Sequence, residues 1–205
     1  AGTATHKFLA IAELPEIARG RSLSEERDRL IAAGKLSSEE AALVLLDGIA
    51  AFMNGELGMS LMQNAATAQR EVPFTVGVHP EEILKSGKFE TRGPVILQGV
   101  VDLYFRQADG GIVLIDFKTD DPGEGGARIQ QLIKTYRPQL LLYRAALERA
   151  LGESIASTHL AFLRANVTAQ IPTAAPAREE LARLLRPAAT LHERPDARPM
   201  NGGRV

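Results

Sequence analysis

Three charged side chains near the middle of the sequence have the types and spacing for metal-assisted chemistry. Asp102 lies in one apolar segment, and Asp116 and Lys118 flank Phe117 in the next. If the second segment is a strand, Asp116 and Lys118 lie on one face and Phe117 lies on the other. Two carboxylates and an ammonium in an apolar region are groups that could bind a metal ion or act on a charged substrate.

The two segments, residues 95–105 (VILQGVVDLYF) and 111–119 (GIVLIDFKT), are predicted to form a β-hairpin. The Asp-Gly pair at 109–110 between them is a strong signal for a hairpin turn. A turn centred on this pair places Asp102 opposite about residue 117. The two carboxylates and the ammonium are therefore expected to converge at one end of a sheet.

Such a convergence of charges is unfavourable without a further partner. Two close carboxylates repel each other, and burial of a charge is costly unless the charge is paired. A Mg²⁺ ion would relieve the repulsion, since it prefers oxygen ligands from carboxylates, water and phosphate. Lys118 would then lie beside the metal, within reach of a phosphate or an attacking water. The alternative is an ordinary Asp–Lys ion pair on a solvated strand face, which the second aspartate across the hairpin disfavours.

A helix predicted over about residues 128–151, ending at Gly152, adds two polar side chains. Gln139 and Tyr143 are four residues apart, so they share one face of this helix within a Leu-rich segment. The alternative for Tyr143 is a core residue with a satisfied hydroxyl. Gly99, inside a strand, indicates either a close approach by another group or a simple bend of the sheet.

The first third of the chain is predicted to be helical. Residues 3–14 have helical spacing, and Pro15 suits a helix that ends there. Residues 24–69 are expected to be all-helical, with helix starts at Ser24 and Ser37, where serine precedes acidic residues. The simplest interpretation of this region is a helical part that packs on the rest of the chain.

Strand patterns begin at residue 70, where Val72, Phe74 and Val76 alternate with more polar side chains. Pro138 is expected in the first turn of the later helix. The other elements follow in this order: a polar loop at about 79–94, the hairpin, a turn-rich segment at 120–127, the helix at 128–151, a strand at 157–165 and a Pro/Ala-rich tail with one short helix at 177–185. This order predicts an α/β fold with a mixed central sheet flanked by helices and an N-terminal helical insert.

The composition excludes several classes of protein. The chain has 205 residues with 24 Lys or Arg and 25 Asp or Glu, a formal net charge of −1, and no cysteine. Disulfides, a thiol nucleophile, cysteine-bound zinc and iron–sulfur clusters are therefore excluded. The near-neutral charge argues against an independent tight binder of polyanions. No uncharged stretch approaches the ~20 residues of a membrane helix, so we expect no membrane association. With no cysteine in the chain, we take the reducing cytoplasm as the default compartment.

Five segments occur in a fixed order along the chain: GTATHKFL (2–9), REVPF (70–74), QGVVDLYF (98–105), VLIDFKTD (113–120) and YRPQLLLYRAAL (136–147). Together they resemble the RecB-like nucleases, a branch of the PD-(D/E)xK superfamily. The resemblance is closest to the C-terminal nuclease domain of the AddA subunit of bacterial AddAB helicase–nucleases. It implies a restriction-endonuclease-like core, and the helical insert between the first two segments agrees with it.

The resemblance also implies roles for particular residues, two of which, His6 and Glu71, carry little signal by themselves. It implies one set of metal ligands: an imidazole nitrogen of His6, the carboxylates of Asp102 and Asp116, and the backbone carbonyl of Phe117. It implies a second set that supports catalysis around the metal: Lys118 as the catalytic lysine, Glu71 to help hold the metal, its waters or a second ion, and Gln139 and Tyr143 to orient the lysine or the scissile phosphate. The implied metal is Mg²⁺, with Mn²⁺ as a substitute.

The implied reaction is hydrolysis of phosphodiester bonds, of the exonuclease type on single-stranded DNA, in double-strand break processing and recombinational repair. In such enzymes ATP is used by motor domains, and the AddA-type subunit pairs with an AddB-type subunit. The sequence begins Ala-Gly-Thr without an initiator methionine, so we expect a domain excised from a larger helicase–nuclease. The alternatives are a non-catalytic module that grips DNA or docks a partner subunit, and a free-standing RecB-like exonuclease.

A single nuclease domain is expected to span residues 1–205. Within it we expect a helical part at 1–69, a catalytic sheet-and-helix core at 70–166 and a Pro/Ala-rich tail at 167–205.

Overall fold

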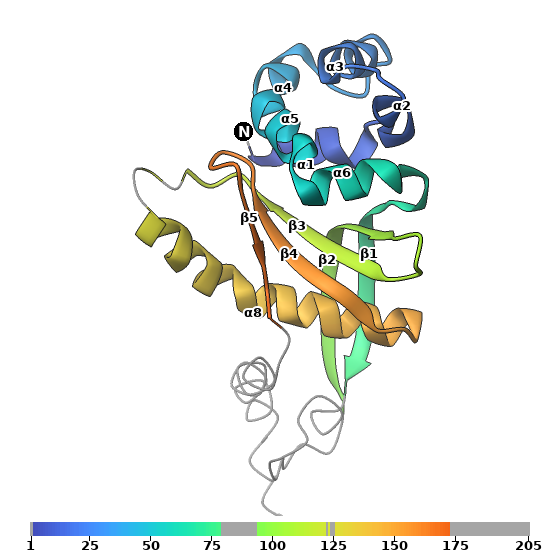
Figure 1. Cartoon of the computed structure of the whole chain (residues 1–205), viewed down its shortest axis with the longest axis vertical. Helices are drawn as coiled ribbons and strands as arrows, with labels where there is room; N and C mark the ends of the chain where they lie inside the picture. Colours follow the sequence, from blue (N-terminus) through green and yellow to red (C-terminus); the bar gives the residue numbers. More distant parts are fainter. Residues whose placement is uncertain (1, 79–93, 122, 124–125, 173–205) are drawn as a thin grey trace, which may run out of the picture.

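The structure is a computed structural model that describes residues 2–78, 94–121, 123 and 126–172. A mixed five-stranded sheet lies between a group of short N-terminal helices and one long helix, as Figure 1 shows. The expected polar loop at 79–94 falls almost wholly outside the described residues, as does the short helix expected at 177–185. Among the described residues, no helix combines the length and the apolar character needed to span a membrane.

The first part of the chain is helical, as predicted. Its elements are α1 (Gly2–Ile11), α2 (Leu14–Ala18), α3 (Leu23–Ala32), α4 (Ser38–Ala42), α5 (Leu46–Asn54), α6 (Glu56–Gln63) and the 3₁₀ turn η1 (Ala65–Thr67). Ser37 caps α4 as expected, through a capping box with Glu40.

Two helix boundaries in this part differ from the sequence-based prediction. Ser22, rather than Ser24, caps α3, because its hydroxyl accepts from the N–H of Glu25 while the Glu25 carboxylate accepts from the N–H of Ser22. Pro15 lies in the first turn of α2 rather than at the end of α1, a position where its missing N–H is not needed.

The sheet has the order β1-β2-β3-β4-β5. Its strands are β1 (Gln69–Val78), β2 (Val95–Arg106), β3 (Ile112–Lys118), β4 (Ile155–Phe162) and β5 (Val167–Gln170). The strands β3 and β4 are parallel, and the helix α8 (Gly126–Leu151) connects them. The strand β5 was not predicted, because four residues are too short for a periodicity signal; it pairs with β4 at the start of the expected tail.

The β2–β3 hairpin is shifted by one residue from the predicted register. Leu103 pairs with Ile115, and the connection spans residues 107–111, closed by a bond from the N–H of Gly110 to the carbonyl of Gln107. Extended by one residue, this register places Asp102 opposite Asp116 rather than residue 117. Because the connection has an odd number of residues, a two-residue turn at 109–110 could not predict it.

The long helix α8 runs through Pro138, which was expected in its first turn. Proline removes one hydrogen bond from the helix interior. The flanking turns are held by packing, since Leu140 and Leu141 are buried against the sheet. Gly152, with φ of +69°, follows the end of the helix as predicted.

Two apolar cores lie on the two faces of the sheet. One joins the N-terminal helices to side chains such as Leu103, Ile115 and Phe117. The other joins α8 to side chains such as Val101 and Leu114. The helical part and α8 therefore cover opposite faces, and the sheet between them carries the residues that could do chemistry (Figure 1).

A buried carboxylate organises the helical part. Glu26 is fully buried and accepts hydrogen bonds from Arg29 (2.6 and 2.9 Å), from Arg21 (2.8 Å) and from the backbone N–H of Glu13 (2.7 Å). Burial raises the pKa of the Glu26 carboxyl, but these hydrogen bonds and the charge of Arg29 outweigh it and lower the pKa to about 2.

Replacing Glu26 by glutamine should lower the free energy of unfolding by about 2 kcal/mol at pH 7, because it removes the buried carboxylate that accepts charge-assisted hydrogen bonds from the partly exposed Arg21 and Arg29. The wild-type pKa lies below the value of 4.5 for the unfolded chain, so the stabilisation is present above pH ~4.5 and is lost as the pH falls toward ~2. Urea unfolding at pH 7 and pH 3 measures both effects. The exposed Glu39→Gln variant is the control, and equal stability of E26Q and E39Q would contradict the prediction.

Candidate active site

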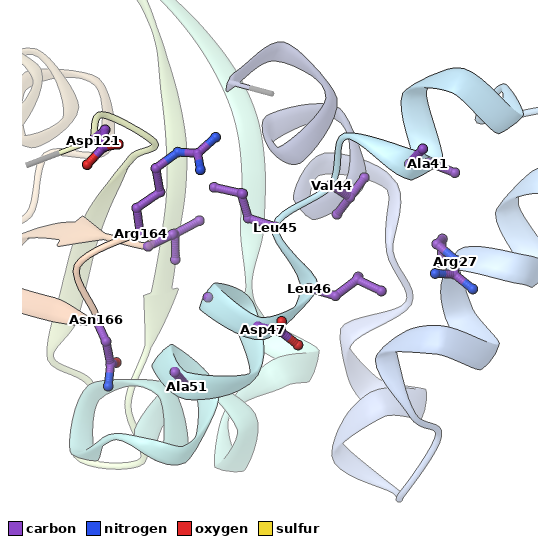
Figure 2. Close-up of a pocket in the computed structure, with 13 residues that line it drawn as sticks. Arg27, Ala41, Val44, Leu45, Leu46, Asp47, Ala51, Asp121, Arg164 and Asn166 are labelled. Carbon is purple, nitrogen blue, oxygen red and sulfur yellow. The ribbon is translucent and has the colours of Figure 1, made fainter. Parts of the chain in front are cut away.

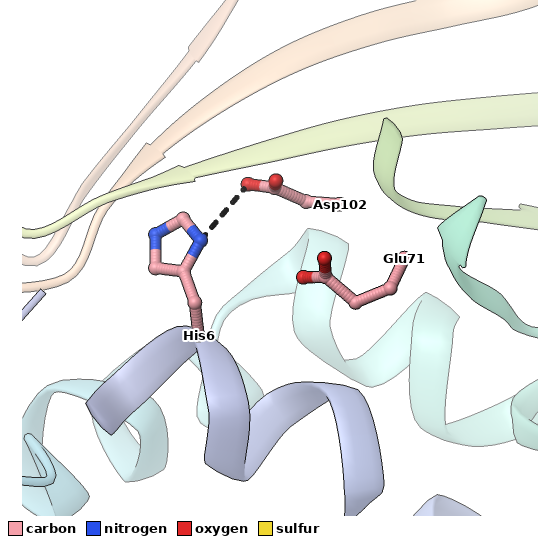
Figure 3. A group of neighbouring side chains, drawn as sticks. All are labelled: His6, Glu71 and Asp102. Carbon is pink, nitrogen blue, oxygen red and sulfur yellow. Dashed lines mark ion pairs between the residues drawn. The ribbon is translucent and has the colours of Figure 1, made fainter. Parts of the chain in front are cut away.

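Three side chains from three different elements meet at one end of the sheet. His6 comes from α1, Glu71 from β1 and Asp102 from β2, and each offers one ligand atom within 4.8 Å of the others. The Nδ1 of His6 lies 3.7 Å from Oδ2 of Asp102. Figure 3 shows the imidazole and both carboxylates directed toward a common space between α1 and the strands.

The backbone of Glu71 has an unusual conformation that shapes this cluster. Its φ is +48°, in the left-handed region that few non-glycine residues adopt. The neighbouring pairs Arg70–Leu103 and Val72–Val101 keep one register, so Glu71 lies opposite Asp102. Strain of this kind concentrates at functional sites, and here it occurs at the step where the two carboxylates meet.

The face of β2 that packs in each core also changes at Asp102, the residue opposite Glu71. Val101 packs in the core under α8, whereas Leu103, two residues later, packs in the core under the N-terminal helices. In a regular strand these two side chains would lie on one face. The change of face at Asp102 therefore allows its carboxylate to approach His6.

Arg70 connects the strand that carries Glu71 to the helix that carries His6. Its guanidinium donates to the carbonyls of Leu9 (3.2 Å) and Ala12, at the C-terminal end of α1. A cation at this end of a helix satisfies free carbonyl groups and complements the helix dipole. This contact fixes the position of His6 relative to Glu71.

A second group of side chains lies on the α8 side of the sheet. The Nζ of Lys118 is 2.6 Å from Oδ2 of Asp116, and both side chains are largely buried. The same ammonium donates to Oε1 of Gln139 (3.3 Å), and Nε2 of Gln139 donates to the hydroxyl of Tyr143 (2.8 Å). The structure thus brings together the four residues that the strand and helix periodicities had singled out.

The two groups are joined through the backbone of β3. The N–H of Phe117 donates to Oδ2 of Asp102 at 2.8 Å. The Phe117 ring points the other way, into the core under the N-terminal helices, where it meets Phe52 edge-on at 5.3 Å. Asp116 is not one of the three residues within 4.8 Å of one another, and a ligand role for the Phe117 carbonyl stays a prediction.

Comparison with known proteins decides the family. A family model described as the PD-(D/E)XK nuclease superfamily matches residues 1–204. The chain belongs to this superfamily.

This PD-(D/E)XK nuclease is also similar to curated bacterial proteins, each described as one subunit of an ATP-dependent helicase/nuclease. The relative from Enterococcus faecalis is 29% identical over 173 residues, 84% of this chain and 14% of the relative. The relative from Bacillus cytotoxicus is 31% identical over 170 residues, 80% of this chain and 14% of the relative. The relative from Lactiplantibacillus plantarum is 34% identical over 146 residues, 71% of this chain and 11% of the relative. The chain therefore spans about one seventh or less of these proteins.

The site of this PD-(D/E)XK nuclease holds an excess of negative charge. Burial and, to a smaller extent, the nearby Asp116 carboxylate raise the pKa of Asp102 to about 7, against the opposing effects of the Phe117 N–H and Lys118. Burial also raises the pKa of Asp116, although Lys118 opposes the shift. Two neighbouring carboxyl groups with raised pKa values are typical of a site where a bound cation would stabilise the ionised carboxylates.

The donor atoms of the site agree with a hard divalent cation. Carboxylate oxygens are the typical ligands of Mg²⁺ and Mn²⁺, and an imidazole nitrogen is a common ligand of divalent first-row transition-metal ions. Oδ2 of Asp116 is buried, and its close partner within the described part of the chain is the Lys118 ammonium at 2.6 Å. A bound cation would satisfy this oxygen as well as the charge of Asp102.

Gly99 makes room for the aromatic side chains beside the site, so the close-approach interpretation is confirmed. A Cβ at this position would lie 2.8 Å from the Phe74 ring and 3.0 Å from the Tyr143 ring. These two rings meet edge-on, with centroids 5.4 Å apart. A Cβ at Gly99 would require the Phe74 ring to shift and would press on Tyr143, the residue that accepts from Gln139.

Two residues near Lys118 were not singled out from the sequence. Tyr136 lies beneath the ammonium, and its hydroxyl donates to Asp120, which follows β3. A signal for Tyr136 was available, because it lies three residues before Gln139 and seven before Tyr143, on the same helix face. Asp120 had no such signal, since it lies in a turn.

A cavity of about 720 Å³ lies beside the site, between the segment joining α4 to α5 and the ends of β3 and β4. Figure 2 shows Leu45, Asp47, Asp121 and Arg164 around it. The Nε of Arg164 donates to the carbonyl of Thr119, the residue after Lys118. The predicted catalytic side chains do not line this cavity, whose charged side chains are of both signs.

Proposed function

We propose that this chain is the nuclease domain of an ATP-dependent helicase–nuclease, and that it hydrolyses phosphodiester bonds of single-stranded DNA with a bound divalent cation. The observation that carries the proposal is the position of the His6, Glu71 and Asp102 cluster next to the Asp116–Lys118 ion pair. Membership of the PD-(D/E)XK superfamily supports the reaction class. The names of the relatives support the helicase–nuclease context.

In this mechanism His6, Asp102 and Asp116 would hold the cation, and Glu71 and the Phe117 carbonyl would assist. When bound, the cation stabilises negative charge on the phosphate and favours ionisation of the attacking water. Mg²⁺ is the proposed ion, and Mn²⁺ is expected to replace it, since both are bound by oxygen ligands.

Of the other side chains, Lys118 acts on the phosphate directly and the rest support it. Lys118 places its ammonium at the developing charge on the phosphate oxygens, where a fixed cation in a water-poor site is most effective. Gln139 accepts from this ammonium and donates to Tyr143, so the pair sets the direction of the lysine. The exposed Glu71 carboxylate is placed to hold waters around the cation.

The wider assignment rests on the resemblance to AddA-type subunits and covers the whole assembly. We infer that ATP is consumed by motor domains, that an AddB-type subunit is the partner, and that the assembly works in the cytoplasm on double-strand breaks during recombinational repair. We also infer that residues 1–205 act as one nuclease domain. Because the net charge is −1, the chain alone should cleave DNA weakly and without processivity.

The decisive experiment is a cleavage assay with labelled single-stranded DNA and Mg²⁺ or Mn²⁺. We expect slow, ATP-independent cleavage that EDTA abolishes and that Asp116→Ala reduces below detection, since this substitution removes a buried ligand. The exposed Asp28→Asn variant should cleave like the wild type. Cleavage that persists in D116A or in EDTA would contradict the proposed site, and cleavage confined to duplex DNA would contradict the proposed substrate.

A further inference from the structure

The ammonium of Lys118 lies over an aromatic ring that has no part in the mechanism above. Its Nζ is 4.2 Å from the centroid of the Tyr136 ring, which α8 presents one turn before Gln139. The face of an aromatic ring attracts a cation at this distance. The ammonium is therefore held from three directions, by the Asp116 carboxylate, the Gln139 amide oxygen and the Tyr136 ring.

The Tyr136 ring is itself fixed at both ends. Its hydroxyl donates to both carboxylate oxygens of Asp120, at 2.9 and 3.0 Å. The ring also lies near the buried ring of Phe162, at 6.5 Å between centroids and an interplanar angle of 47°. Asp120 follows the end of β3 and Phe162 ends β4, so the ring bridges α8 to the strand ends that surround Lys118.

We propose that Tyr136, held in place by Asp120, is a positioning residue that keeps the Lys118 ammonium directed at the scissile phosphate. This proposal rests on the proposed nuclease function and names a residue that neither the family match nor the sequence analysis assigns. A lysine side chain has a flexible four-carbon stem and loses its direction without contacts on its ammonium. A metal ion bound to the Asp116 carboxylate would weaken the Asp116–Lys118 ion pair. The contact with the Tyr136 ring would then be more important for the position of the ammonium.

The first test compares variants that keep or remove the aromatic face. Tyr136→Leu should lower kcat by about tenfold, with KM and Mn²⁺ affinity unchanged within about twofold. Tyr136→Phe keeps the face and should lose only about twofold to threefold. Tyr104→Leu is the matched control, because Tyr104 packs against the same core but lies on β2 opposite Leu114, four residues before Lys118.

The second test separates positioning from a general structural effect. In a Lys118→Met background, Tyr136→Leu should cause no further loss of activity, because the group that it positions is already gone. Asp120→Ala should resemble Tyr136→Phe, and combining the two should cost no more than either alone, since both remove the same hydrogen bond.

A spectroscopic readout makes the test independent of DNA cleavage. Protons on the Lys118 side chain above the ring should show upfield ring-current shifts in the NMR spectrum of the metal-free protein. Tyr136→Phe should keep these shifts, and Tyr136→Leu should abolish them. Unshifted protons in the wild type would overturn the proposal even if the enzyme proved inactive. If Lys118→Met abolishes cleavage while folded Tyr136→Leu cleaves at the wild-type rate, the proposed function stands and this inference fails.

Discussion

Replacing Lys118 by methionine should lower kcat for DNA cleavage by about 10²- to 10³-fold, the typical effect of removing one fixed group that stabilises transition-state charge. The same substitution should tighten the binding of Mn²⁺. The reason is that Nζ of Lys118 lies 2.6 Å from Oδ2 of Asp116, so the ammonium competes with a metal ion for that oxygen. Methionine keeps most of the buried stem and removes the charge.

Single-turnover cleavage and isothermal titration calorimetry measure the two effects separately. Lys134→Met, on the exposed side of α8, is the control and should change neither quantity. A lower kcat together with tighter Mn²⁺ binding distinguishes a lysine that contacts the phosphate from a purely structural one. A parallel loss of activity and of metal affinity would show that Lys118 holds the site together instead.

Replacing Asp102 by asparagine should abolish metal binding and, without metal, stabilise the fold. Burial and the neighbouring Asp116 raise the pKa of Asp102 to about 7, so its ionised form is disfavoured in the metal-free protein. Asparagine has no charge, and its amide oxygen can still accept from the N–H of Phe117. We expect the free energy of unfolding of the metal-free protein at pH 8 to rise by about 2–4 kcal/mol.

The pH dependence follows from the direction of the shift. The folded-state pKa of Asp102 lies above the value of 3.8 for the unfolded chain, so the metal-free wild type loses stability as the pH rises from ~4 to ~7. Mn²⁺ should therefore raise the wild-type Tm more at pH 8 than at pH 5.5, and should leave D102N unchanged at both. Thermal unfolding measures this, with Asp28→Asn as the exposed control. A D102N variant that is less stable than the metal-free wild type at pH 8 would contradict the electrostatic account.

Local patterns in the sequence predicted most of the elements. The apolar runs around Asp102 and Asp116 formed strands, and the helical spacing of Gln139 and Tyr143 placed both on one face of α8. Such predictions succeed because apolar side chains recur with the period of a strand or a helix, and this recurrence can be seen in the sequence itself. The five family segments extended the prediction to His6 and Glu71, which no periodicity could single out.

Local patterns did not predict the features that depend on interactions between distant parts of the chain. The hairpin register slipped by one residue because the connection at 107–111 is longer than a two-residue turn. α8 continues through Pro138 because packing in the core compensates for the lost backbone hydrogen bond. The strand β5 forms because it pairs with β4 at the edge of the sheet and because Ile171, the residue after β5, is buried.

By itself, the sequence determined which residue types could do chemistry: the D-x-K strand, the second aspartate and the polar helix face. Only the tertiary structure decided how they meet. The left-handed backbone of Glu71 and the change of face at Asp102 direct two carboxylates toward His6, and the Asp120–Tyr136 contact places a ring beneath Lys118. The reason is physical: backbone strain and contacts between groups far apart in sequence depend on the packed whole, and no repeat in the chain encodes them.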